Sequence, residues 1–316
     1  MKIISFTKQY VEEAASLALR NYMEEQKVTQ ALPCMESVPD LSYFTENGLG
    51  VVALEQNKVV GFLGCYNPWE EAFDSLATGT YSPIHAHGAV KENRIRIYQQ
   101  MYQEAADLWV RNKITYHAIG LYAHDQQATE AFYTYGFGLR CVDAIRKMEW
   151  SEDFKEDSIQ FEELAAEKRE QANPLRKLLS EHMGESPCFM YSSEEEIQQS
   201  LLHIEQEKER IFVAKEGEKI VAFLKIADEG ENFVTNHKQM KNICGAFCLE
   251  AYRGRKIYQR LIGYVISKLR AEGNQYLGVD YESFNPTANR FWPKCFTPYT
   301  NSLVRRIDEG VLNKYK

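Results

Sequence analysis

The segment ALEQNKVVGFL at residues 53–63 recurs as AKEGEKIVAFL at residues 214–224, and this pair decides the architecture. The two segments lie 161 positions apart and share Ala, Glu, Lys, Val, Phe and Leu in the same register. Each predicts a strand, a polar turn and a second strand, which together form a β-hairpin. A repeat over this distance indicates that one fold is present twice, in tandem.

The repeat extends well beyond the hairpin. Between the two copies, the stretch EWSEDFKEDS at residues 149–158 is acidic and has no apolar period, which predicts a solvated linker. We therefore expect an N-terminal domain over residues 1–150, a linker over 151–158 and a C-terminal domain over 159–316. Further matches at an offset of 160 are Ile97-Tyr98-Gln99 with Ile257-Tyr258-Gln259, Tyr116 with Tyr276, and Ala128 with Ala288.

The same order of elements is expected in both copies. It begins with a strand and a helix, continues with antiparallel hairpins and ends with alternating strands and helices. This order predicts an α/β fold of the mixed α+β kind, in which each domain is a twisted mixed sheet with helices on both faces. In the first copy the expected elements are a strand at 3–6, a helix over 11–22, a hairpin at 51–65, a strand at 84–89, a helix over 97–109, a strand at 117–123, a helix over 126–135 and a strand at 140–148.

The composition is that of an ordinary soluble protein, and we expect a cytoplasmic one. The net charge of −8 offers no basic face for phosphates, which argues against a nucleic-acid partner. No stretch approaches the ~18 apolar residues that a membrane helix needs, and the first residues lack a signal-peptide pattern. The seven cysteines are scattered without a Cys-x-x-Cys pair, which suits free thiols in a reducing compartment.

The stretch LEAYRGRKIYQRL at residues 249–261 follows a predicted strand and enters a long helix. Backbone N–H groups at a helix N-terminus form an anion site, and Arg253, Arg255 and Lys256 would add positive charge. This stretch and the repeat around it resemble the GNAT superfamily of acyl-CoA-dependent N-acyltransferases, over nearly the whole chain as two tandem domains. In that family a (Gln or Arg)-x-x-Gly-x-(Gly or Ala) loop cradles the pyrophosphate of the acyl-CoA.

The resemblance implies that the second copy holds acetyl-CoA as co-substrate. Arg253 matches the first loop position, whereas Lys256 and Tyr258 stand where the family has small residues. The family's Asn after the fifth strand corresponds to Asn285, and its proton-donating Tyr corresponds to Trp292. An indole cannot act as a general acid at neutral pH.

The first copy departs further from the family pattern, which predicts that it is degenerate. Its loop carries Asn93, Arg96 and Tyr98, while Asp125 and Phe132 replace the Asn and the Tyr.

The acyl-CoA site implied by the resemblance combines the loop, the preceding strand and the Asn. The loop would hold the pyrophosphate, Asn285 the pantetheine arm, and the strand backbone near Phe247 and Cys248 the thioester carbonyl. The expected binding residues are Phe247, Cys248, Arg253, Gly254, Arg255, Lys256, Ile257 and Asn285.

Acylation of an amine needs a general base or a chain of water molecules that removes a proton from the ammonium. Asp280 and Glu282 share one face of a predicted strand, and the first copy has no acid at the matching positions. They are therefore candidates for the base or for recognition of a cationic amine. The alternative is that they form ion pairs with helix residues such as Arg290. Tyr299 is the candidate proton donor in place of Trp292. The alternatives are that water donates the proton or that the thiolate leaves without a donor.

Histidines and cysteines in the predicted strands are expected to be structural. His85 and His87 lie two apart and face the same way, but a metal site needs three or four converging ligands, so we expect no metal. Cys244 and Cys248 also share a strand face and are expected to be small buried hydrophobes.

These observations predict an enzyme that transfers an acetyl group from acetyl-CoA to a small-molecule or peptide amine by direct attack. One alternative is a catalytically degenerate GNAT-fold protein that serves as a binding or scaffold protein. Another is acyl transfer from a different carrier such as a charged tRNA, against which the net charge argues. Exposed strands such as Thr80-Tyr81 could pair between chains, which would give an oligomer.

Overall fold

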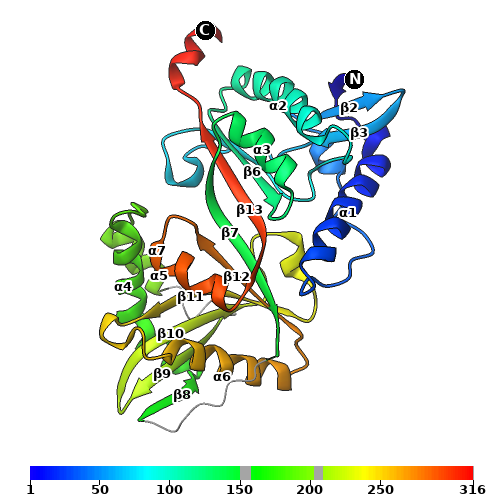
Figure 1. Cartoon of the computed structure of the whole chain (residues 1–316). Coiled ribbons are helices and arrows are strands. Elements are labelled where there is room, and N and C mark those ends of the chain that lie inside the picture. The colour runs from blue at the N-terminus through cyan, green and yellow to red at the C-terminus, as the bar shows by residue number, and fades with distance from the viewer. Residues whose placement is uncertain (150–157, 203–208, 316) are drawn as a thin grey trace. The chain divides into compact units, whose positions relative to one another are not determined.

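The computed structural model describes residues 1–149, 158–202 and 209–315 (Figure 1). The chain forms two compact units, one of Met1–Val142 with Pro298–Lys316 and one of Asp143–Thr297. Both contain helices together with parallel and antiparallel strands, so the predicted mixed α+β class is confirmed. The expected linker lies outside the described residues except for Ser158.

The first unit follows the order of elements that the sequence predicts. Strands β1, β2, β3 and β5 form an antiparallel sheet, while β6 pairs in parallel with β4 and antiparallel with β13. The strands are β1 (Lys2–Ser5), β2 (Val51–Glu55), β3 (Lys58–Leu63), β4 (Gly79–Ser82), β5 (His87–Ala89), β6 (Tyr116–Tyr122) and β13 (Thr297–Arg306), and the helices include α1 (Val11–Val28), α2 (Arg94–Arg111) and α3 (Gln126–Thr134).

Helix α2 packs through the apolar stripe that its spacing predicts. Its buried residues recur every three or four positions, which places them along one face of a helix. This face contacts β2 and β3, and Trp109 also donates its Nε1 hydrogen to the backbone oxygen of Leu49 (3.0 Å). The buried stripe consists of Ile97, Tyr98, Met101, Tyr102, Ala105 and Trp109.

The second unit repeats the arrangement. Strand β12 runs parallel to β11, and β10, β9 and β8 follow across the sheet in antiparallel pairs. Helix α4 packs on β10 and β11, and helix α6 packs on β9 and β10. The strands are β8 (Ile159–Glu163), β9 (Arg210–Glu216), β10 (Lys219–Ala227), β11 (Met240–Cys248) and β12 (Tyr276–Glu282), and the helices include α4 (Asn173–Gly184), α5 (Glu194–Leu202), α6 (Ile257–Ala271) and α7 (Pro286–Phe291).

The two units do not coincide with the two copies in the sequence. The last strand of the first copy, β7 (Gly138–Lys147), enters the second unit at Asp143 and neighbours β12. The last strand of the second copy, β13, belongs to the first unit from Pro298 onwards, where its residues 300–306 pair with β6. Residues 143–147 of β7 thus belong to the second unit, and residues 298–306 of β13 belong to the first. The domain bounds 1–150 and 159–316 stay a prediction.

The strand that contains Thr80 and Tyr81 is covered, contrary to expectation. Thr80 is fully buried, and Tyr66 donates its backbone N–H to the oxygen of Tyr81 (2.9 Å). Trp69 and Gly79 exchange two backbone hydrogen bonds of 3.1 and 3.0 Å. These bonds use the strand edge within the unit, so the predicted exposure of this strand is wrong.

Histidines of the first unit are held by protein groups. His87 hydrogen-bonds the Tyr98 hydroxyl (3.0 Å) and the backbone oxygen of Gly120 (2.5 Å), and His117 hydrogen-bonds the Tyr102 hydroxyl (2.9 Å). Burial lowers the pKa of both imidazoles to about 4, so they are neutral at physiological pH. These contacts support a structural role.

The described ranges, which omit residues 150–157, 203–208 and 316, contain neither a membrane-spanning helix nor a metal-binding cluster. No helix there is long and apolar enough to cross a membrane. Nor do those ranges bring three or more His, Cys, Asp or Glu side chains together in a metal-binding arrangement.

Candidate active site

Strands β11 and β12 diverge halfway along their length. Their parallel pairing covers Met240–Ile243 and Tyr276–Val279 and then stops, although β11 stays paired with β10 up to Cys248. At Cys244 the register between β10 and β11 shifts by one residue, which makes a β-bulge. A bulge bends its strand and increases the local twist, and here it lies where β11 separates from β12.

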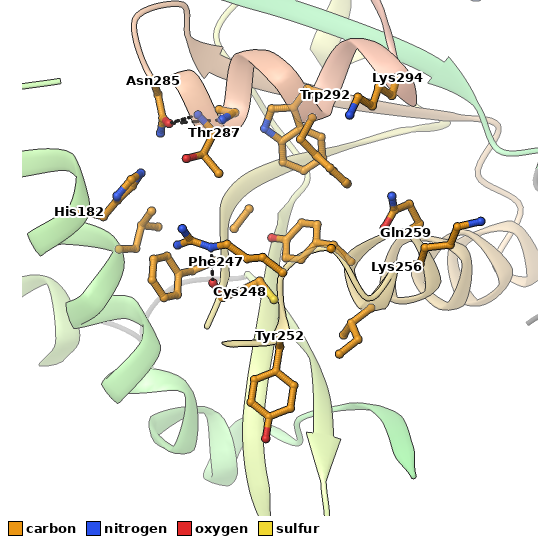
Figure 2. A pocket seen from close by; sticks show the side chains of 18 residues that line it. His182, Phe247, Cys248, Tyr252, Lys256, Gln259, Asn285, Thr287, Trp292 and Lys294 are labelled. Atoms are coloured by element: carbon orange, nitrogen blue, oxygen red, sulfur yellow. Dashed lines mark hydrogen bonds between the residues drawn. The ribbon is translucent and has the colours of Figure 1, made fainter. Parts of the chain in front are cut away.

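A cavity of about 290 Å³ lies at the separated end of the two strands (Figure 2). It is lined by the end of β11, the loop that leads into α6, the first turn of α6, helix α7 and the C-terminal half of α4. The structure therefore brings together most of the residues that the sequence predicts for acyl-CoA binding. These are Phe247, Cys248, Arg253, Gly254, Lys256, Ile257 and Asn285, with Arg255 as the exception.

The loop before α6 has the backbone conformation of an anion cradle. Gly254 (φ 76°) and Lys256 (φ 59°) are both left-handed, and α6 begins directly afterwards at Ile257. Left-handed residues in such a turn direct backbone N–H groups towards a concave surface, and the helix start adds the positive end of its dipole. Glycine adopts this conformation at no steric cost, which accounts for the family's preference for Gly where this chain has Lys256.

The basic side chains of the loop divide between the cavity and the surface. Arg253 turns inwards, where its Nε donates to the backbone oxygen of Cys248 (3.1 Å) and its guanidinium lies 5.5 Å from the ring centre of Phe247. Arg255 instead lies 3.6 Å from the carboxylate of Glu216 and over the ring of Tyr252. These contacts explain why Arg255 does not line the cavity.

The two polar atoms of the Asn285 amide differ in their hydrogen bonds: Oδ1 is fully used and Nδ2 makes only a weak bond. Its Oδ1 accepts hydrogen bonds from the backbone N–H groups of Thr287 (3.0 Å) and Ala288 (3.2 Å), which caps α7. Its Nδ2 donates to the sulfur of Met183 on α4 (3.4 Å). A thioether is a weak acceptor, so a ligand carbonyl could take this hydrogen bond.

The bulky residues at the family's small and tyrosine positions pack against one another. The Tyr258 hydroxyl donates to the backbone oxygen of Phe223 on β10 (2.9 Å), so this side chain points towards the sheet. Its ring meets Phe291 and Trp292 edge-on, with centroids 5.3 and 6.0 Å away. Trp292 is buried and lines the cavity where the family has its tyrosine.

The two predicted catalytic carboxylates lie on β12 and do not line the cavity. Asp280 directly follows the last residue paired with β11, so it lies where the strands begin to separate. Val279 and Tyr281 are buried while Asp280 and Glu282 are half-buried, which agrees with the predicted alternation of faces. Arg290, which the alternative names as an ion-pair partner, donates its Nε to the backbone oxygen of Pro286 (3.0 Å).

Asp280 has an environment that favours its neutral form. Burial, followed by the nearby carboxylates of Asp143 and Glu231, raises the pKa of Asp280 to about 8. A carboxyl group with a pKa near the working pH is both available in its ionised form and basic enough to accept a proton. This raised pKa suits a general base, and the role of Asp280 as the base stays a prediction.

Tyr299 is not part of this cavity. It lies on β13 in the first unit, where it is fully buried and its backbone oxygen accepts the N–H of Ala123 (3.0 Å). Tyr299 lies away from the cavity because β13 pairs with β6 in the first unit. The expected proton donor is therefore not among the residues that line the site.

The cysteines of β11 are not buried as expected. Cys244 is exposed, and Cys248 is half-buried and lines the cavity. Burial raises the pKa of the Cys248 thiol to about 11, although Arg253 and Arg255 act in the opposite direction. Both residues lie on the part of β11 that no longer pairs with β12, which explains their exposure.

Helix α4 contributes residues that the sequence reasoning missed. Leu179 and His182 line the cavity, and Figure 2 shows His182 entering from the side opposite Lys256 and Gln259. A single histidine near the end of an amphipathic helix gives no signal by itself. Only the packing of α4 on β11 places it in the site.

In the first unit, a helical turn replaces the anion cradle. Helix α2 begins at Arg94, three residues before Ile97, whereas α6 begins at Ile257, the residue that matches Ile97. The positions that match 254–256 are therefore helical in the first unit.

Arg94 fills the corresponding place with an ion-pair network. Its guanidinium is buried and binds Asp125 (2.8 Å) and Glu24 (2.9 Å), and it donates to the backbone oxygens of Ala89 (2.9 Å) and Val90 (3.2 Å). Asp125 occupies the position of Asn285 in the repeat. The first unit thus lacks both the loop and the neutral amide of the second.

Comparison with known proteins agrees with this geometry. Residues 175–296, which lie within the second unit, match the model of the Acetyltransferase (GNAT) family, and the resemblance seen in the sequence is confirmed. A search of curated proteins finds no match.

Solved structures show the same fold at low sequence identity. A GCN5-related N-acetyltransferase from Sphaerobacter thermophilus aligns with a TM-score of 0.58 and 12% identity, over 96% of this chain and 95% of that one. A GCN5-related glucosamine N-acetyltransferase region of a fungal multi-domain GH3 β-N-acetylglucosaminidase aligns with a TM-score of 0.50 and 11% identity. That alignment covers 96% of this chain and 38% of the fungal chain. At these identities the likeness concerns the fold.

Proposed function

We propose that this protein is an N-acyltransferase that transfers an acetyl group from acetyl-CoA to an amine. The observation that carries the proposal is the cavity at the separated end of β11 and β12, where the anion cradle and the Asn285 amide meet. Such a gap accepts an extended chain, and the cradle at its mouth suits a pyrophosphate. The family match of this unit supports the same activity.

The backbone of β11 supplies hydrogen-bond donors to the cavity. Leu249 donates its N–H to Val221 on β10 (2.9 Å), and alternate residues of an antiparallel strand bond to the same neighbour. By this alternation the N–H groups of Cys248 and Ala246 face the gap. Donors placed there would bind the pantetheine arm and polarise the thioester carbonyl.

The acyl transfer itself requires one bond to form and one to break. Asp280 in its ionised form takes a proton from the acceptor ammonium, and the neutral amine attacks the thioester carbon. The nitrogen gives its second proton to solvent as the amide forms. The carbon–sulfur bond then breaks and CoA leaves as a thiolate. The acceptor is a small-molecule or peptide amine, and the carboxylates around Asp280 favour a cationic one.

Titration calorimetry with acetyl-CoA tests the proposal. We expect the unmutated protein to bind with micromolar affinity and Arg253→Glu to lose this binding, because the charge reversal places a carboxylate at the cradle. Arg96→Glu is the matched control, since Arg96 is an exposed residue in the first turn of α2. Arg96→Glu should bind like the unmutated protein.

If the unmutated protein does not bind acetyl-CoA, the proposed acetyl transfer is wrong. It would favour a GNAT-fold scaffold or a different acyl carrier. Where binding is found, release of free thiol in the presence of spermidine, a peptide with a free N-terminus or an aminoglycoside would identify the acceptor class.

A further inference from the structure

The proposed reaction produces a thiolate, and the residue that protonates it is still to be identified. Trp292 stands in the family's tyrosine position and has no transferable proton at neutral pH. The donor must lie in the cavity, because that is where the CoA arm would run. The titratable side chains that line the cavity are His182, Cys248, Tyr252, Arg253, Lys256, Tyr258 and Lys294.

The tyrosines and the cysteine of the cavity are poor proton donors. The Tyr258 hydroxyl is committed to the backbone oxygen of Phe223, and burial raises its pKa well above the usual value. The Tyr252 hydroxyl donates to the carboxylate of Glu216 (2.7 Å), and this hydrogen bond raises its pKa. Burial raises the pKa of Cys248 to about 11. None of the three releases a proton readily near neutral pH.

His182 differs from these groups in both chemistry and position. Its Nε2 is buried and has no hydrogen-bond partner within the described parts of the chain. Its ring meets Phe247 edge-on with a centroid distance of 6.3 Å, which holds it beside the end of β11. Figure 2 shows the ring reaching into the cavity on the side of Asn285 and Thr287. Imidazole is the side chain that gains and loses a proton near neutral pH.

We propose, on the basis of the acyl transfer proposed above, that His182 is the catalytic acid that protonates the departing thiolate. As the carbon–sulfur bond breaks, the electron pair stays on sulfur and the imidazolium Nε2–H of His182 passes its proton to that sulfur. The products are the free thiol of CoA and a neutral imidazole. Solvent then returns a proton to the imidazole, while the first proton of the ammonium leaves through Asp280 and the second passes directly to solvent.

The other charged groups that face His182 across the cavity are cations. These cations are Arg253 and Lys256 of the loop and Lys294, which follows α7. The neutral titratable groups of the cavity are the thiol of Cys248 and the phenols of Tyr252 and Tyr258. Arginine and lysine stay charged between pH 5 and 8.

The test compares His182→Gln with the unmutated protein over a range of pH. We expect a bell-shaped profile of kcat/KM for the unmutated protein, because the base must be ionised and the acid protonated. The variant should lose the fall at high pH and about 100-fold in kcat. Its affinity for acetyl-CoA should be unchanged in calorimetry. Added imidazole should restore part of the activity of His182→Ala, which a merely structural role would not allow.

The matched control is His237→Gln, a half-buried histidine of the same unit that does not line the cavity. His237→Gln should keep the bell-shaped pH profile of kcat/KM of the unmutated protein. An unmutated protein that is active, with a His182→Gln variant of equal rate and equal pH profile, would overturn the role of His182 alone. An unmutated protein that binds no acetyl-CoA would overturn the acyl transfer and the role of His182 together.

Discussion

At the scale of the residue, Asp280 is the group whose surroundings define its chemistry most sharply. Its pKa of about 8 results first from burial and then from the carboxylates of Asp143 and Glu231. As a base it must be ionised, so its ionisation contributes the rise of kcat/KM with pH. In Asp280→Asn we expect kcat/KM to fall by about 100-fold and its rise with pH to disappear. Steady-state kinetics between pH 5 and 9 check this, and an unchanged rise would assign the base elsewhere.

The same carboxyl group should also make stability depend on pH. Its pKa in the folded state lies above the unfolded value of 3.8, so the folded state binds the proton more tightly. Stability is therefore lost as the pH rises from about 4 to about 8. Asp280→Asn removes this contribution, so its melting temperature should fall less over that range. Asp228→Asn, at an exposed carboxylate, should behave like the unmutated protein.

At the scale of the element, Lys256 at the start of α6 has opposite effects on stability and on binding: its backbone conformation lowers stability, while its charge favours acetyl-CoA binding. Lys256 adopts a left-handed conformation that costs a non-glycine residue about 1 kcal/mol. Lys256→Gly should therefore raise the stability by up to about 1 kcal/mol while weakening acetyl-CoA binding through the lost charge. Ser267→Gly is the control, because an exposed glycine inside α6 should lower stability by roughly 0.5 kcal/mol. Thermal unfolding distinguishes the two, and a destabilised Lys256→Gly would contradict the conformational argument.

The elements were predictable from the sequence because their signals are local. The period of Ile97, Met101 and Ala105 depends only on the helix itself, and the hairpin around residues 53–63 only on its turn. The bulge at Cys244 was not predictable, since it depends on how β10 and β11 align. The place of His182 in the site likewise depends on packing between elements that are far apart in the chain.

At the scale of the whole molecule, the repeat predicted two copies of a fold but not how the strands are shared. The apolar pattern of β7 or β13 says that a strand forms, yet it does not say which neighbour it pairs with. Because β13 pairs with β6, Tyr299 lies in the first unit and not in the second. The predicted acyl-CoA residues were unaffected because they lie between β11 and α7, within one unit.

The two units should differ in ligand binding, because only the second has an open cradle. In the first unit Arg94 is bound to Glu24 and Asp125 where a loop and a neutral amide would be needed. Calorimetry should therefore give one acetyl-CoA per chain. Arg94→Ala should keep this stoichiometry and affinity but lower stability by about 3–5 kcal/mol, because it leaves two carboxylates without their cation. Two bound molecules per chain, or loss of binding in Arg94→Ala without loss of stability, would show that the first unit also binds the acyl donor.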